Sequence, residues 1–148
     1  MNAKVNWTAV VVAAIVYFVI GAVWYITLTD PWLAGVGKTE AQIRAERPDP
    51  TMAFLITFLC NLILASVLAQ VIVATAAKPT AFHGIRVAFI AWAGFIATTL
   101  MMNYQFEVRT FTLWAINAGY PLVGMLVMGA ILGAWTKKDT ALVKTASV

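Results

Sequence analysis

The sequence predicts an all-α membrane protein: one transmembrane domain of 148 residues with four helices in an antiparallel bundle and a short surface helix between helices 1 and 2. The first observation is composition, because 62% of the residues are hydrophobic and 11% are charged. Soluble domains are about 45–50% apolar and about 25% charged. A soluble chain of this length buries only about 68–70% of its surface, which leaves too much apolar surface in water.

The second observation is the position of the charges, which leave residues 5–29, 50–77, 87–106 and 110–136 uncharged. A helix needs about 20 apolar residues to cross the hydrocarbon core. Backbone groups in lipid must be paired within the segment, which favours helices. We therefore expect spans at about 7–28, 51–77, 82–106 and 111–135. The first is too long for a signal peptide, no small-x-small cleavage site follows it, and we expect it to be retained.

The connections follow from local signals. Thr39-Glu40-Ala41-Gln42 has the pattern of a capping box and predicts a short surface helix, which Pro48 ends. The third and fourth spans are separated by a few residues around Val108, which predicts a tight hairpin.

Lysine and arginine favour one orientation. The predicted end that carries both termini has Lys4, Lys78, Arg86, Lys137, Lys138 and Lys144, and the other end has Lys38, Arg44, Arg47 and Arg109. The positive-inside rule then favours both termini in the cytoplasm. The basic pI of about 9.5 is attributed to flanks that face anionic lipid, and we expect no nucleic-acid partner.

Polar residues gather toward the outer side of the predicted bundle. At about 1.5 Å per residue, Asn61 lies near the midplane, and Asn117 is level with Thr98 and Thr99 in the hairpin. Pro121 removes an amide donor from the carbonyl of Asn117, which predicts a kink or break at 117–121. Two interpretations stay open, an outward-facing polar pocket or amides that hydrogen-bond the helices together. The candidate pocket residues are Asn61, Thr98, Thr99, Asn103, Asn117 and Tyr120.

Two further pairs have two interpretations each. Glu107 and Arg109 are either an exposed ion pair or a charged rim above the pocket. Gly129 and Gly133 form a GxxxG motif, which packs helices closely either within the chain or between subunits.

Residues for catalysis are scarce. The sequence has one histidine, His83, and one cysteine, Cys60, and no cluster of histidine, cysteine and carboxylate. It has no glycine-rich phosphate loop. Apart from Arg86, near the cytoplasmic start of the third span, no charged residue lies within a predicted span, which argues against ion-coupled transport by a monomer. We therefore expect no enzyme activity, no metal and no cofactor.

The sequence also resembles a known family over essentially its whole length. The similarity rests on Asn6-Trp7, Gly21-Ala22-Val23-Trp24-Tyr25, Trp32, Gly37-Lys38-Thr39-Glu40, Gly94-Phe95-Ile96-Ala97-Thr98-Thr99, Asn103-Tyr104-Gln105-Phe106-Glu107, Asn117-Ala118-Gly119-Tyr120 and Met128-Gly129-Ala130-Ile131-Leu132-Gly133. These motifs resemble the bacterial membrane proteins grouped as domain of unknown function 1761, and Pro121 departs from their pattern. The resemblance implies a four-helix protein of the bacterial inner membrane and implies no activity.

Two functions are consistent with these observations. The first is a small non-enzymatic membrane protein that works as a homo-oligomer or as an accessory subunit of a larger membrane complex. The alternative is a channel, or a binder of a small solute or lipid, that uses the outward-facing polar pocket. Membrane lipids are expected partners in both.

Overall fold

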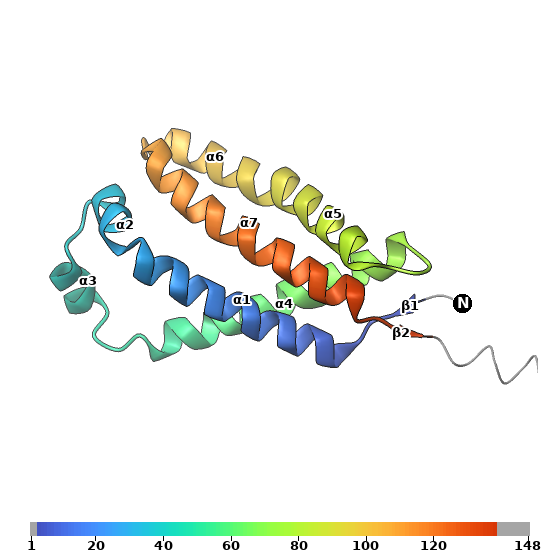
Figure 1. Ribbon diagram of the computed structural model, residues 1–148. Coiled ribbons are helices and arrows are strands. Elements are labelled where there is room, and N and C mark those ends of the chain that lie inside the picture. Colours follow the sequence, from blue (N-terminus) through green and yellow to red (C-terminus); the bar gives the residue numbers. More distant parts are fainter. Residues whose placement is uncertain (1–2, 139–148) are drawn as a thin grey trace, which may run out of the picture.

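The computed structural model describes residues 3–138, which are almost entirely helical. Figure 1 shows their arrangement. In chain order the elements are β1 (Ala3–Lys4), α1 (Trp7–Thr27), α2 (Thr29–Val36), α3 (Glu40–Glu46), α4 (Thr51–Thr75), α5 (Ala81–Ala91), the π-helix η1 (Trp92–Ala97), α6 (Thr98–Phe106), α7 (Phe111–Ala134) and β2 (Lys137–Lys138).

Four helical segments are long and apolar enough to cross a membrane: Trp7–Thr27, Thr51–Thr75, Ala81–Phe106 and Phe111–Ala134. Each of their ends lies within two residues of the bounds expected from the sequence. The second segment ends two residues before its expected bound, because the backbone of Ala76 is extended, three residues ahead of Pro79. Proline disfavours helix at the residue before it, so the chain cannot continue as a helix into the next segment.

Helix α7 is the central helix, in contact with α1, α4 and α5. In Figure 1, α5 and α6 lie along α7, with β1, β2 and the α4–α5 loop at one end. Helices α2 and α3 and the α6–α7 turn lie at the other end. The core between the helices combines small residues with a few larger ones: Ala9, Ala13, Ala14, Ala65, Ala69, Ala88, Val10, Leu68, Ile72, Met125, Met128 and Leu132. Small residues let helix backbones approach closely.

The closest approach is between α5 and α7, at the glycine pair singled out in the sequence. A Cβ built on Gly129 would lie 2.4 Å from the carbonyl oxygen of Gly84, and one on Gly133 would lie 2.3 Å from that of Thr80. A Cβ built on Gly84 would lie 1.9 Å from the carbonyl oxygen of Gly129. The GxxxG face is therefore occupied by α5 of the same chain, which leaves no room there for a second subunit.

The irregular helical segment lies in a different span from the one expected. Helix α7 continues through Pro121 without interruption, whereas the third span contains the π-helix Trp92–Ala97. The expected break at 117–121 is therefore wrong, whereas a kink at Pro121 stays a prediction. Two indoles support the helix there, because Trp24 Nε1 donates to Ile116 O at 3.0 Å and Trp92 Nε1 donates to Ala118 O at 2.9 Å. These bonds lie on either side of the carbonyl that the proline deprives of its amide partner.

The surface elements are small and locally determined. The capping box that begins α3 is confirmed, since Thr39 N donates to Gln42 Oε1 at 2.8 Å and Gln42 N donates to Thr39 Oγ1 at 3.3 Å. Helix α2 was not expected; it ends at Gly37, whose φ of 75° favours glycine.

Strands β1 and β2 pair antiparallel, with Lys4 opposite Lys137. This pairing places the two ends of the described chain side by side (Figure 1). Lys144, which contributes to the predicted orientation, lies outside the described residues.

Candidate functional site

A groove of about 740 Å³ that includes polar groups lies between α1 and α4, and we call it the α1–α4 groove. One stripe of α1 forms one wall, α4 forms the other, and a single side chain of α7 closes the floor. Its lining residues are Phe18, Gly21, Ala22, Tyr25, Ile26, Thr29, Phe54, Thr57 and Tyr120. Gly21 and Ala22 create the space because they have little or no side chain. The rings of Phe18 and Phe54 meet edge to face, with centroids 6.1 Å apart.

The threonine hydroxyls of the groove can serve a bound ligand mainly as hydrogen-bond acceptors. Thr57 Oγ1 donates to Ala53 O at 2.7 Å, and Thr29 Oγ1 donates to Tyr25 O at 2.7 Å. Their protons therefore bond to the helix backbone, and lone pairs on the oxygens stay available. The groove is therefore a mostly apolar surface groove with a few hydroxyl groups whose positions are fixed by hydrogen bonds.

Asn61 lies beneath the floor of the groove. It is on the same face of α4 as Thr57, one helical turn deeper, and its side chain lies beside the hydroxyl of Tyr120. Only 5% of Asn61 is exposed, and its Nδ2 has no hydrogen-bond partner within residues 3–138. A buried polar group without a partner costs about 1–3 kcal/mol. The fold therefore holds an unused donor next to Tyr120.

A chain of aromatic and amide groups extends from this floor across three helices. The rings of Tyr17 and Tyr120 lie 4.8 Å apart, and those of Tyr25 and Tyr120 lie 5.8 Å apart. Tyr25 donates to Asn117 Oδ1 at 2.9 Å, and Asn117 Nδ2 donates to the Tyr104 hydroxyl at 2.6 Å. Asn117 is thus hydrogen-bonded on both sides and connects α1, α7 and α6.

The structure brings together only some of the residues expected to line a polar pocket. Tyr120 lines the α1–α4 groove, Asn61 lies beneath it, and Asn117 reaches it through Tyr25.

The other three expected pocket residues, Thr98, Thr99 and Asn103, are exposed on α6 and do not line the groove. The hairpin sets their height along the bundle, but Trp92 and Trp114 fix which face turns inward. Trp114 Nε1 donates to Ala97 O at 3.2 Å, and this bond turns the threonines outward.

The charged pair of the hairpin turn lies elsewhere. Arg109 Nε donates to Glu107 Oε2 at 3.3 Å, and both side chains are largely exposed. Arg109 Nη1 also approaches Val36 O at 3.5 Å, at the end of α2. Neither residue lines the α1–α4 groove, so the pair connects the turn to α2 and forms no rim above this groove.

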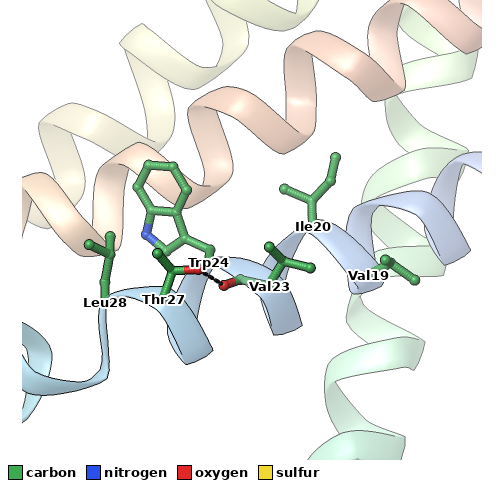
Figure 2. Close-up of a pocket in the computed structure, with 6 residues that line it drawn as sticks. All are labelled: Val19, Ile20, Val23, Trp24, Thr27 and Leu28. Atoms are coloured by element: carbon green, nitrogen blue, oxygen red, sulfur yellow. Dashed lines mark hydrogen bonds between the residues drawn. The ribbon is translucent and has the colours of Figure 1, made fainter.

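A second, shallower hollow lies on the opposite flank of α1. Figure 2 shows its six lining residues, which are five residues of α1 and the C-cap residue that follows it: Val19, Ile20, Val23, Trp24, Thr27 and Leu28. The ring of Trp24 projects toward α7, and Thr27 Oγ1 donates to Val23 O at 2.8 Å. This hollow has no available polar side chain other than the threonine.

Groups for covalent or metal chemistry do not gather in the described part of the chain. Residues 3–138 contain no group of three histidine, cysteine or acidic side chains that could hold a metal ion. The Cys60 side chain is exposed on α4, and His83 Nε2 lies 3.0 Å from Thr75 Oγ1.

Sequence reasoning missed the α1–α4 groove. The available signal was Gly21-Ala22 placed one turn from Phe18 and from Tyr25, which predicts a gap between large side chains on one helix face.

Comparison with known proteins gives one match. The family model described as "Protein of unknown function (DUF1761)" matches residues 8–133. No curated protein and no solved structure matches the chain.

Proposed function

Since the chain belongs to the DUF1761 family, whose description names no activity, we propose its function from its geometry: a multi-pass membrane protein that binds a membrane amphiphile in the α1–α4 groove and catalyses no reaction. The observation that carries this proposal is the groove itself, with about 740 Å³ of mostly apolar space and a few hydroxyls. Binding sites for small molecules typically enclose about 300–1,000 Å³ and have this mixture of groups.

The outer surface supports insertion in a membrane. Large apolar side chains point outward along the four long helices, including Ile26 and Phe95, each 75% exposed. Lipid would cover these side chains, whereas their exposure to water would cost free energy. The ends of the bundle in Figure 1 support an antiparallel arrangement, with β1 and β2, the two ends of the described chain, on one side. The excess of lysine and arginine supports our proposal that this side faces the cytoplasm, and the family resemblance supports the bacterial inner membrane as the location we propose.

The dimensions of the groove suit a hydrocarbon chain. Its lining on α1 extends from Phe18 to Ile26, eight residues or about 12 Å along the helix, and Thr29 at the start of α2 continues it. One leaflet of the hydrocarbon core is about 15 Å deep, half of the ~30 Å total. A chain lying in the groove would place its polar end beside Thr29 and Tyr25. An ion channel does not suit this cavity, because its walls lack the polar groups that replace hydration.

The experiment that tests this proposal is native mass spectrometry of the protein extracted gently from its own membranes. Ala22→Trp fills the groove with an indole, because Ala22 lines it and is exposed. We expect wild-type protein to carry a lipid or another small amphiphile, and Ala22→Trp to lose it. Val23→Trp is the matched control, because Val23 is 60% exposed on the opposite flank of α1. Equal retention in both variants would reject the groove as the site.

A second candidate function is assembly, as a homo-oligomer or as an accessory subunit of a larger membrane complex. The observation that favours it is the hollow in Figure 2, where α1 presents apolar side chains with no neighbouring helix lining the opposite wall. The same two variants separate the candidates. Assembly through this flank predicts that Val23→Trp changes the subunit number or removes a co-purifying protein, while Ala22→Trp leaves both unchanged.

A further inference from the structure

A separate groove lies between α4 and α5, and we call it the α4–α5 groove. It holds about 400 Å³ and is lined almost entirely by apolar side chains of α4, α5 and η1, with Met125 of α7 at its base. On α4 it extends from Leu64 to Thr75, eleven residues or about 16 Å. This length again matches one leaflet of the hydrocarbon core, about half of ~30 Å.

One end of the α4–α5 groove carries polar groups. Thr75 lines it, and Thr75 Oγ1 lies 3.0 Å from His83 Nε2, so a hydroxyl and an imidazole bridge α4 and α5 there. Lys78 follows in the exposed loop. Arg86 is exposed on α5, next to Val87 and one turn from Ile90, both of which line the groove. An apolar groove with basic groups at one end matches the two parts of an anionic lipid.

In the described part of the chain, the two basic residues near this end of the groove have no acidic partner. Within residues 3–138, neither Lys78 nor Arg86 forms an ion pair. The sequence has no acidic residue between Asp49 and Glu107. The acids of α2, α3 and the α6–α7 turn lie at the opposite end of the bundle (Figure 1), and Asp139 lies outside the described residues. Lys137 adds positive charge at the same end as the α4–α5 loop.

We propose that the α4–α5 groove binds an anionic phospholipid, with one acyl chain against Val71, Val87 and Ile90 and the phosphate beside Arg86 and Lys78. Basic pockets between helices at a membrane face are typical sites for anionic headgroups. The imidazole and hydroxyl of His83 and Thr75 supply further hydrogen bonds at the glycerol level. This site is distinct from the α1–α4 groove, so it stands independently of the proposed function.

The test measures lipid binding by native mass spectrometry, with the purified protein in detergent and phosphatidylglycerol or phosphatidylcholine of the same acyl chains added. We expect wild-type protein to bind phosphatidylglycerol at least tenfold more tightly than phosphatidylcholine. Each basic side chain contributes about fivefold, which corresponds to ~1 kcal/mol. Arg86→Gln with Lys78→Gln should therefore reduce the preference to about twofold or less. Lys38→Gln with Arg109→Gln, at the other end, is the charge-matched control and should keep it.

The apolar part of the site has its own variant. Val71 lines the α4–α5 groove and is 42% exposed, so Val71→Trp should weaken binding of phosphatidylglycerol about tenfold or more. Leu59→Trp, at a 58% exposed position of α4 that does not line this groove, should leave it unchanged. Three results would overturn the proposal: equal affinity for the two lipids, a preference lost equally in the control charge variant, or unaltered binding in Val71→Trp.

Discussion

Replacing Gly84 by alanine will push α5 away from α7 and destabilise the fold. The added Cβ would lie 1.9 Å from the carbonyl oxygen of Gly129, where ordinary contact begins at 3.4 Å. The two helices must therefore separate locally by about 1.5 Å, the difference between these distances. Both contacting atoms are fixed to backbone, so no rotamer change relieves the clash.

The expected destabilisation is about 2 kcal/mol. Overpacking costs typically 1–3 kcal/mol, and a gap of 0.5–1 Å removes about a quarter to a half of the dispersion attraction between neighbouring atoms. Helix propensity offsets about 1 kcal/mol, since alanine is preferred to glycine within a helix. The assay is reversible unfolding in mixed micelles of dodecylmaltoside and sodium dodecyl sulfate, followed by far-UV circular dichroism.

The matched control is Gly94→Ala, in the π-helix of the same span. Gly94 has nothing within 4 Å of an added Cβ, so we expect its free energy of unfolding to be unchanged or slightly increased. The reasoning is refuted if Gly84→Ala is as stable as Gly94→Ala. It is also refuted if Gly129→Leu alters the subunit number while the stability of the chain stays unchanged, because the glycine face would then belong to a subunit interface.

Three further predictions concern hydrogen bonds. Asn117→Leu removes the hydrogen bonds to Tyr25 and Tyr104 and should lower the free energy of unfolding by about 1–2 kcal/mol. Asn103→Leu, at an exposed position, should leave the free energy of unfolding unchanged in the same assay. Trp24→Phe keeps a large ring but loses the hydrogen bond to the backbone of α7, so we expect the free energy of unfolding to fall by about 1 kcal/mol. A decrease smaller than about 0.3 kcal/mol would contradict a stabilising role for the indole N–H. The backbone N–H of Thr51 donates to Asp49 and lowers the pKa of its carboxyl, so Asp49→Ala should reduce the Tm at neutral pH. This difference should disappear as the pH falls below about 4, where the wild-type carboxylate becomes protonated, and a difference that persists in acid would reject a stabilising role for this hydrogen bond.

Much of the architecture could be predicted from the sequence because it depends on quantities that run along the chain. The length of an uncharged stretch and the rise of a helix set each span, and the capping box at Thr39 begins α3 through contacts three residues apart. Pro121 shows the limit of such local signals. The sequence indicates the missing amide, but the indoles of Trp24 and Trp92, which support α7 beside it, come from distant parts of the chain.

The sequence by itself determined the number of long helices and, within two residues, their bounds. Only the tertiary structure decided which way each helix faces. A helix that is apolar all round carries no amphipathic pattern from which its rotation can be predicted. The sequence predicts Thr98 and Asn117 at the same level, yet one is exposed and the other connects three helices. For the same reason the partner of Gly129 and the α1–α4 groove emerge only when the helices pack, since close backbone contact and empty space are properties of pairs of helices.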